Sequence, residues 1–240
     1  MENISATQWK RLYAKTLSLV QPYIDQKQFI DDSTPDAPVK SAPDDYRDFL
    51  LECHQNVGKT DYFRRRGLSE ETVKRFMLGF HPHKNLVTIP YNADLNDGYI
   101  HRILWNGNNK YCKHGNEIFN AAALQNHDTV FVTEGQFDAL SFEELGYPCV
   151  GLGGTNEIGK LVALLNATEN RKTLILALDN DAPGRKATAK LIDMLAETGC
   201  ELIWDSRIYK DYKDANEFLV RDREGFRQMI EEVTLPHYKE

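Results

Sequence analysis

The sequence has no long hydrophobic run and no paired cysteines. No stretch approaches the roughly 18 apolar residues needed to span a membrane, and the start, MENISATQWKRLYAK, lacks the basic-then-apolar order of a secretory signal. The 4 cysteines stand singly and form no CxxC pair, which argues against a zinc ribbon and against a redox site. We therefore expect a cytoplasmic protein with buried thiols, no zinc and no membrane partner.

The chain also lacks an excess of positive charge. Its 240 residues include 29 Lys and Arg against 36 Asp and Glu, which gives a formal net charge of -7. Binding of nucleic acid over a whole surface normally leaves a basic footprint, so this balance disfavours a passive nucleic-acid binder. A metal enzyme is compatible with it, because clustered carboxylates recruit divalent cations that then contact phosphate.

Composition and periodicity divide the chain into segments. Apolar residues recur at helical spacing within residues 1–30, and the proline-rich acidic stretch DDSTPDAPVKSAPDD predicts a flexible linker over 31–45. We expect a smaller α+β subdomain over 46–127, a larger domain over 128–222, and a C-terminal helix with a tail over 223–240.

The smaller subdomain begins with helical patterns and continues with β-type patterns. A helix is expected from Tyr46 to about residue 57. Ser69, followed three residues later by Thr72, marks the start of a second helix, which Gly79 would close. The runs LVTIPY and YIHRILW, separated by the turn-rich ADLNDG, predict a β-hairpin.

From residue 129 onward, apolar strands alternate with amphipathic helices. The strand patterns are TVFVTEG, CVGLGG, TLILALD and ELIWDSR, and the segments between them have helical periodicity. Strands that are apolar on both faces are typical of a parallel sheet covered by helices on both sides. The predicted fold class is therefore α/β, a Rossmann-like parallel sheet flanked by helices and preceded by the smaller α+β subdomain.

Acidic residues follow three of these strands. Glu134 ends the first strand, Asp179 and Asp181 end the third, and Asp214 lies in the loop after the fourth. Asp138 follows Glu134 at a spacing of four, which would place both carboxylates on one helix face. Ligands collect beyond the carboxyl ends of parallel strands, and carboxylates gathered there need a hard divalent cation to offset their repulsion. The pattern predicts a Mg²⁺ or Mn²⁺ site.

Each of these acids, taken alone, has a structural alternative. Asp181 precedes Ala182 and Pro183 and could cap the following helix. Glu134 and Asp138 could be solvated acids at a helix start, where the helix dipole favours negative charge. Their joint placement at the strand ends of one domain favours the metal site.

The motifs EGQFDAL, LALDNDAPGRKA and KDANEF, within about residues 128 to 220, resemble the TOPRIM domain shared by bacterial-type primases, topoisomerases, ribosomal RNA maturases and recombination proteins. The resemblance implies that Glu134 is an acid–base catalyst or a metal ligand. It also implies that Asp179 and Asp181 hold Mg²⁺ against a nucleotide or polynucleotide phosphate.

Further positions resemble the primase branch of this superfamily. Asp138 and Asp214 match additional acidic positions of primases, whereas Asn216 stands where primases often have another Asp. Its amide oxygen could still ligate a metal, with less charge. The turn at Gly154 and Thr155 is interpreted as a backbone turn near the site.

The preceding segment resembles the N-terminal half of the bacterial and phage primase polymerase domain. The motifs RRRGLSEETVKRFMLGF, IPYNADLNDGYIHRIL and NKYCKHGNEIFNAAAL carry this resemblance. It implies that Arg102, Lys110 and Tyr111 line the groove that binds template and nucleotide. Apart from the resemblance, Lys110 is an exposed loop cation.

Other basic residues are candidates for phosphate contacts. The most basic run consists of Arg64, Arg65 and Arg66, which form either a solvated helix face or a phosphate contact. Lys213 precedes Asp214, and we expect it to contact a nucleotide or a nucleic acid.

The resemblance implies a metal-dependent nucleotidyltransferase that synthesises short RNA primers on single-stranded DNA from nucleoside triphosphates. Two alternatives stay open: a TOPRIM nuclease that cleaves DNA or RNA, and a non-catalytic, primase-derived module that binds nucleic acid or a replication protein such as a replicative helicase. Primases usually carry a zinc-binding domain, which the sequence does not show. We therefore expect a stand-alone protein of a phage or other mobile element, or a fragment of a longer protein.

Overall fold

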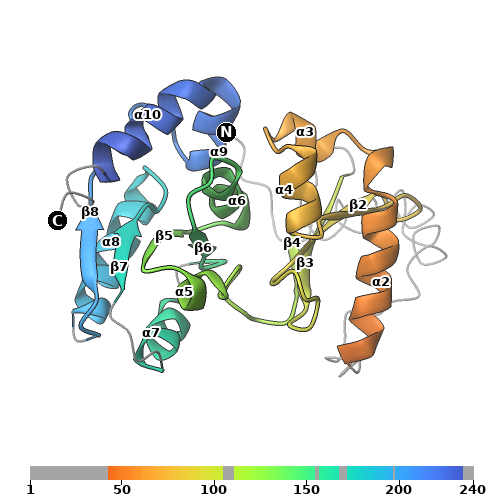
Figure 1. Cartoon of the computed structure of the whole chain (residues 1–240), viewed down its shortest axis with the longest axis horizontal. Helices are drawn as coiled ribbons and strands as arrows, with labels where there is room; N and C mark the ends of the chain where they lie inside the picture. Colours follow the sequence, from red (N-terminus) through yellow and green to blue (C-terminus); the bar gives the residue numbers. More distant parts are fainter. Residues whose placement is uncertain (1–42, 105–110, 155–156, 168–171, 197, 235–240) are drawn as a thin grey trace, which may run out of the picture. The chain divides into compact units, whose positions relative to one another are not determined.

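The computed structural model of the chain contains two β-sheets with helices around them (Figure 1). It describes residues 43–104, 111–154, 157–167, 172–196 and 198–234. Within these ranges, no helix is both long and apolar enough to cross a lipid bilayer. Outside them lie the expected N-terminal helix, the linker up to residue 42, Lys110 and Thr155.

The first described helix, α2 (Pro43–Gln55), begins earlier than the sequence predicts. We expected the linker to reach residue 45 and the helix to begin at Tyr46. Proline is favourable in the first turn of a helix, where its missing N–H costs no hydrogen bond. The helix therefore extends back to Pro43, and the 3₁₀ helix η1 (Val57–Lys59) follows it.

Two short helices follow, α3 (Tyr62–Arg65) and α4 (Glu70–Arg75). Ser69 caps α4 as predicted, because its hydroxyl oxygen accepts a hydrogen bond from the backbone nitrogen of Thr72 at 3.2 Å. The prediction that Gly79 closes this helix is wrong, since Gly79 begins a strand. A Cβ at Gly79 would lie 2.6 Å from Cβ of Cys53 in α2, so the glycine permits close contact between the strand and α2.

An antiparallel sheet follows, with strand order β1-β2-β3-β4. Its strands are β1 (Gly79–His81), β2 (Leu86–Pro90), β3 (Tyr99–Ile103) and β4 (Tyr111–His114). The predicted hairpin is confirmed, since β2 and β3 are antiparallel neighbours with Ile89 opposite Ile100. The short helix α5 (Ala123–Asn126) connects this region to the second sheet.

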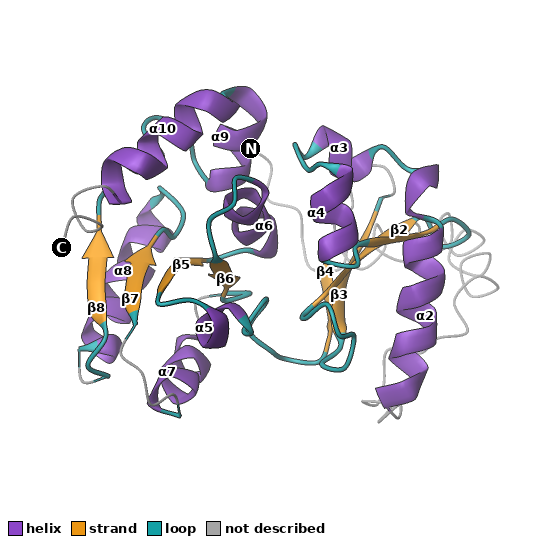
Figure 2. Cartoon of the chain, in the orientation of Figure 1, coloured by secondary structure: helices purple, strands orange, loops and turns teal. Residues whose placement is uncertain are grey.

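The second sheet is parallel, as predicted, with strand order β6-β5-β7-β8 (Figure 2). Its strands are β5 (Thr129–Thr133), β6 (Cys149–Gly151), β7 (Thr173–Leu176) and β8 (Glu201–Trp204). Its helices are α6 (Gln136–Glu144), α7 (Ile158–Asn166), α8 (Ala182–Leu195), α9 (Ala215–Arg221) and α10 (Arg223–Thr234). The α/β fold class is confirmed.

Helices cover both faces of the parallel sheet because its strands are apolar on both faces. In β5, Val130 and Val132 belong to a hydrophobic cluster with residues of α7 and α8, whereas Phe131 belongs to a cluster with residues of α6, α9 and α10. Figure 2 shows α7 and α10 on opposite sides of the sheet. The cluster around Phe131 also contains Phe63 of α3 and Val87 of β2, so buried residues of the two sheets share one core.

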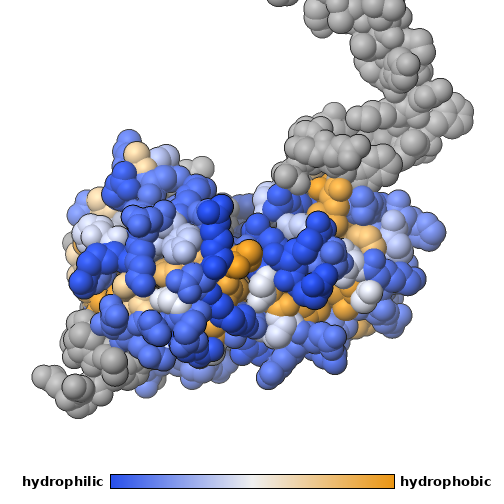
Figure 3. Space-filling model, turned by 90° about the horizontal axis from the view of Figure 1, so that it is seen from above, coloured by the Kyte–Doolittle hydropathy of each residue, from blue (hydrophilic) through white to orange (hydrophobic). Residues whose placement is uncertain are grey.

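The described surface is mostly polar. Seen from above in Figure 3, hydrophilic side chains cover most of this face, with small apolar areas between them. The large apolar side chains that are exposed each belong to a different element, and they are Tyr111, Leu164, Met194, Trp204 and Val220.

Candidate metal and phosphate site

The carboxyl edge of the parallel sheet borders a cavity of about 380 Å³. Four predicted metal ligands line it, namely Glu134, Asp138, Asp179 and Asp214. Asp181 is not among the lining residues, but its charge is close enough to raise the pKa of Glu134. The structure therefore brings the predicted acids together, because the carboxyl ends of parallel strands meet at one edge.

Glu134 and Asp138 approach this cavity from different backbone positions. Helix α6 begins at Gln136, with Gly135 as its N-cap, so Glu134 precedes the helix. The prediction that both carboxylates share one helix face is therefore wrong. Gly135 has no side chain, and a Cβ there would lie 2.6 Å from Oδ2 of Asp138, so the glycine leaves room for the Asp138 carboxylate.

Two of the acids also cap helices. Oδ1 of Asp181 accepts a hydrogen bond from the backbone nitrogen of Gly184 at 2.9 Å, at the start of α8. Oδ1 of Asp214 accepts one from the backbone nitrogen of Glu217 at 2.8 Å, at the start of α9. The capping alternative for Asp181 is thus confirmed, and capping holds each of these carboxylates at a fixed position beside the sheet edge.

Lys213 supplies positive charge within the acidic group. Its Nζ lies 3.1 Å from Oδ2 of Asp179 and 4.0 Å from Oδ2 of Asp214. The hydrogen bond to Asp179 raises the pKa of Lys213. These carboxylates therefore already stabilise a cation between them.

Burial and mutual repulsion raise the pKa values of three acids. Burial raises the pKa of Asp138 to about 7, and the charges of Asp214 and Asp179 contribute to the increase. Burial also raises the pKa of Glu134 and of Asp179, and neighbouring carboxylates add to the effect while Lys213 opposes it. Carboxyl groups whose ionisation is opposed in this way gain stabilisation from a divalent cation.

The donor set fits a hard divalent cation by its chemistry. Carboxylate oxygens are the ligands that Mg²⁺ and Mn²⁺ prefer, and the ammonium of Lys213 shows that the group accommodates positive charge. In the part of the chain that the structure describes, no three His, Cys, Asp or Glu side chains are arranged so that they could hold a metal ion. Binding of such an ion would therefore require Lys213 to move and the carboxylates to approach one another.

Asn216 connects the acidic group to the end of α3. The residue is only 3% exposed, and its backbone nitrogen donates a hydrogen bond to Oδ1 of Asp138 at 3.3 Å. Its side-chain nitrogen donates to the carbonyl oxygen of Arg66 and to Oγ of Ser141, each at 2.9 Å. The amide nitrogen thus links α9 to α6 and to Arg66, while the suggested role of the amide oxygen as a weak metal ligand stays a prediction.

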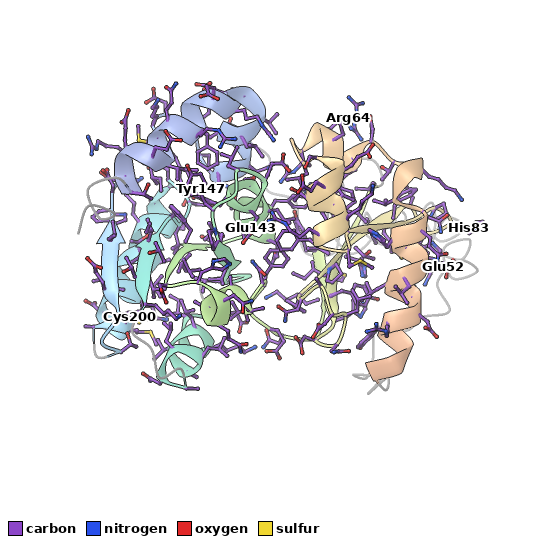
Figure 4. The ribbon with its side chains drawn as sticks, in the orientation of Figure 1. Glu52, Arg64, His83, Glu143, Tyr147 and Cys200 are labelled. Carbon is purple, nitrogen blue, oxygen red and sulfur yellow. The ribbon has the colours of Figure 1, made fainter. Side chains whose placement is uncertain are left out.

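The three consecutive arginines have different environments. Arg66 lines the cavity, and its guanidinium lies 4.4 Å from the centroid of the Phe137 ring. Arg64 and Arg65 have side chains that are 80% and 64% exposed, and both pair with Asp61. Figure 4 shows the Arg64 side chain pointing outward from α3. Of the three arginines, only Arg66 lines this cavity, and phosphate contacts of Arg64 and Arg65 stay a prediction.

Arg102 and Tyr111 lie opposite each other on β3 and β4. Nη1 of Arg102 donates a hydrogen bond to the hydroxyl of Tyr111 at 2.9 Å. The guanidinium also lies 5.1 Å from the Tyr111 ring centroid and 5.8 Å from that of Tyr62. Tyr111 lines the cavity, whereas Lys110 is outside the described residues.

Sequence reasoning missed some residues of this region. Among the described residues, Nε2 of Gln136 is buried without a hydrogen-bond partner, and Gln136 lines the cavity. The ring of Tyr62 lies 5.8 Å from the guanidinium of Arg102. The position of Gln136 between two acids of the EGQFDAL motif was a signal for it. The predicted turn is present, with φ values of 74° at Gly153 and 136° at Gly154, and both glycines line the cavity.

Comparison with known proteins identifies relatives of this chain. Residues 131–219 match the family described as Toprim-like. A DNA primase of Mycoplasma genitalium is 31% identical over 110 residues, which cover 44% of this chain and 18% of that protein. A DNA primase of Thermotoga maritima is 23% identical over 231 residues, covering 75% and 40% of the two chains. The chain thus spans less than half the length of either curated relative.

A solved structure shares the fold. The RNA polymerase domain of Mycobacterium tuberculosis primase DnaG superposes with a TM-score of 0.60 at 14% sequence identity, and the match covers 83% of this chain and 84% of that one. Identity at this level shows the fold alone. Residues 131–219 therefore form a Toprim-like domain, and the chain is similar in part to DNA primases.

Proposed function

We propose that the protein is a metal-dependent nucleotidyltransferase that synthesises short RNA primers on single-stranded DNA. This proposal rests on one cavity that carries both acidic and basic side chains. The acidic residues that line it are Glu134, Asp138, Asp179 and Asp214, and its lining also includes Arg66, Tyr111, Lys113 and Lys213. Carboxylates suit divalent cations and the basic side chains suit phosphates. The similarity to primases supports the same choice of substrates.

The acidic group is the proposed metal site. Its members are Glu134, Asp138, Asp179, Asp181 and Asp214. A divalent cation bound there would offset the negative charge that develops when a 3′-hydroxyl attacks a triphosphate.

Two residues of the acidic group have further proposed roles. A carboxyl group with a raised pKa is a better proton acceptor near neutral pH, so Glu134, whose pKa is raised by burial, is the proposed base at its carboxylate oxygen. Lys213 Nζ, which lies 3.1 Å from Asp179 in the free protein, would exchange this partner for a phosphate oxygen.

The arginines and aromatic residues are the proposed binding surface for the template and the nucleotide. Arg66 and Arg102 each have a buried Nε without a hydrogen-bond partner among the described residues, and guanidinium groups suit phosphate oxygens. Tyr111 is 47% exposed, and an exposed aromatic ring beside an arginine suits stacking of an unpaired base. These groups would orient the strand relative to the carboxylates.

Primer synthesis tests the proposal directly. The protein is incubated with single-stranded DNA, labelled ribonucleotides and Mg²⁺, and we expect short oligoribonucleotides. Asp179→Asn should lower the rate on the order of 10³-fold, because a divalent cation contributes several kcal/mol to transition-state stabilisation. Asp193→Asn, at an exposed position of α8, is the matched control and should retain the rate.

Two results would contradict the proposal. Cleavage of the DNA without added nucleotides would assign the same carboxylates to a nuclease. The absence of any oligoribonucleotide across varied templates, with both Mg²⁺ and Mn²⁺, would exclude primer synthesis by this chain alone.

A further inference from the structure

Gln136 is a buried side chain whose amide nitrogen has no hydrogen-bond partner. The residue is 8% exposed, and Nε2 is among the buried polar atoms that the described structure leaves unpaired. A buried donor without a partner costs about 1–3 kcal/mol, so an unpaired group of this kind calls for an explanation. Gln136 lines the cavity that contains the acidic group.

Gly153 lets the backbone approach this amide closely. A Cβ at Gly153 would lie 2.9 Å from Nε2 of Gln136 and 3.5 Å from Nζ of Lys113. Two nitrogen donors therefore lie beside the same glycine, whose φ is 74° and which has no side chain to push them apart. Lys113 is held from another direction by Glu157, whose Oε1 lies 3.9 Å from Nζ.

Helix α6 adds a third source of positive potential. Gly135 is its N-cap and supplies no side-chain acceptor for the first N–H groups of this helix of 9 residues. The positive end of the helix dipole favours an anion at this place. Glu134 and Asp138 flank the same helix start, so an approaching anion needs their charge to be offset, which the cation of the proposed function would do.

We propose that Gln136, Lys113 and the turn at Gly153 form a subsite for a phosphate group, in which Nε2 of Gln136 donates to a phosphate oxygen. A phosphate fits better than a base or a sugar hydroxyl because Lys113 and the helix start both favour negative charge. The inference rests on the proposed function, which supplies two sources of phosphate, the triphosphate of a nucleotide and the backbone of a polynucleotide.

Melting temperature and affinity together distinguish a phosphate-binding role of Gln136 from a structural role. Gln136→Leu removes a donor that has no partner in the ligand-free protein, so the melting temperature should be unchanged or higher. The affinity for a phosphate ligand should fall about tenfold, as expected for one lost hydrogen bond to a charged group. A glutamine with a structural role would instead lower the melting temperature when it is replaced.

Calorimetric titration of the full chain provides the test. One arm uses inorganic pyrophosphate in buffer with Mg²⁺, and the other uses a short oligothymidylate. Lys113→Met is a second variant that removes the other donor and should weaken binding in the same direction. Gln228→Leu, at an exposed position of α10, is the matched control and should bind as the wild type does.

The ligand whose binding is weakened shows whether the phosphate comes from a nucleotide or from a polynucleotide. Weaker binding of pyrophosphate alone supports the subsite and assigns it to the nucleotide, and weaker binding of oligothymidylate alone assigns it to the polynucleotide backbone. The inference is overturned if both variants bind both ligands normally, or if the wild type binds neither.

A primer-synthesis assay run in parallel separates this inference from the proposed function. Binding that depends on Gln136 without any primer synthesis would leave the phosphate subsite in place and remove the proposed function. Primer synthesis with unchanged affinity in both variants would retain the proposed function and remove the subsite.

Discussion

The acidic group and the arginine–aromatic group differ in what their side chains contact. In the acidic group, Asp179 pairs with Lys213, and Asp214 caps a helix. The arginine–aromatic group consists of Arg66, Arg102, Tyr62, Tyr111 and Phe137, where the guanidinium groups lie over rings. In the described structure, Nε of both arginines is buried without a hydrogen-bond partner.

This difference indicates what each group requires from a ligand. Burial raises the pKa values of Asp138, Glu134 and Asp179, and neighbouring carboxylates add to the increase, so a cation improves the environment of this group. The arginines retain donors for which the described structure shows no acceptor. A phosphate that arrives with a divalent cation meets both requirements.

Replacing Asn216, which connects the acidic group to Arg66, should have the largest effect on the free energy of unfolding. Asn216→Asp removes the two hydrogen bonds that its amide nitrogen donates to Arg66 and Ser141. It also places a buried carboxylate beside Asp138. We expect a loss of about 3 kcal/mol in the free energy of unfolding at pH 8, without divalent cations, as for other buried groups left unpaired. Urea denaturation measures it.

Asn126→Asp is the control for this change, because the residue is exposed at the end of α5. Its effect should stay within about 0.5 kcal/mol, as for other surface substitutions. If Asn216→Asp leaves the stability unchanged while strengthening Mn²⁺ binding, residue 216 is a ligand position and the amide is not a structural link.

The parallel sheet could be predicted from the sequence because its signals are local. The run TVFVTEG is apolar on both faces and bounded by polar residues, and the structure places Val130 and Phe131 in clusters on opposite faces. The positions of Glu134 and Asp179 at one cavity followed from the same pattern, since parallel strands end at one edge.

The missed features depend on residues far apart in the chain. Gly79 has the appearance of a helix terminator, and only the contact with Cys53 of α2 shows why the strand needs a glycine there. Asn216 and Arg66 are separated by 150 positions, so their hydrogen bond has no sequence signal. The motif points to Gln136, but that its amide is unpaired depends on which residues surround the side chain in the fold.

The charge within the acidic group should make stability depend on pH. Asp138 has a pKa of about 7 in the folded protein against an ordinary value of 3.8, so the folded state retains its proton over a range in which the unfolded chain has lost it. The contribution of Asp138 to the free energy of unfolding therefore falls as pH rises from about 4 to about 7 and is level above that.

Asp138→Asn removes the titrating carboxyl group and, with it, the loss of stability that its ionisation causes as pH rises. The variant should be more stable than the wild type at pH 8, on the order of 2 kcal/mol, and the difference should vanish near pH 4. Thermal denaturation at the two pH values measures it, with the exposed Asp193→Asn as the control. An equal difference at both pH values would show that Asp138 does not titrate in this range.

The smallest expected effect is on the affinity for oligothymidylate, and it is tested by comparing Arg66 with Arg64. Arg66→Gln should weaken oligothymidylate binding about tenfold and reduce the slope of log affinity against log salt by about 1, as expected for one lost phosphate contact. Arg64→Gln should change the affinity about twofold at most, because Arg64 is 80% exposed and pairs with Asp61. Fluorescence anisotropy across a salt series measures both. If the two variants weaken binding equally, the unpaired Nε of Arg66 has no special role, and polynucleotide affinity reflects only the net charge of α3.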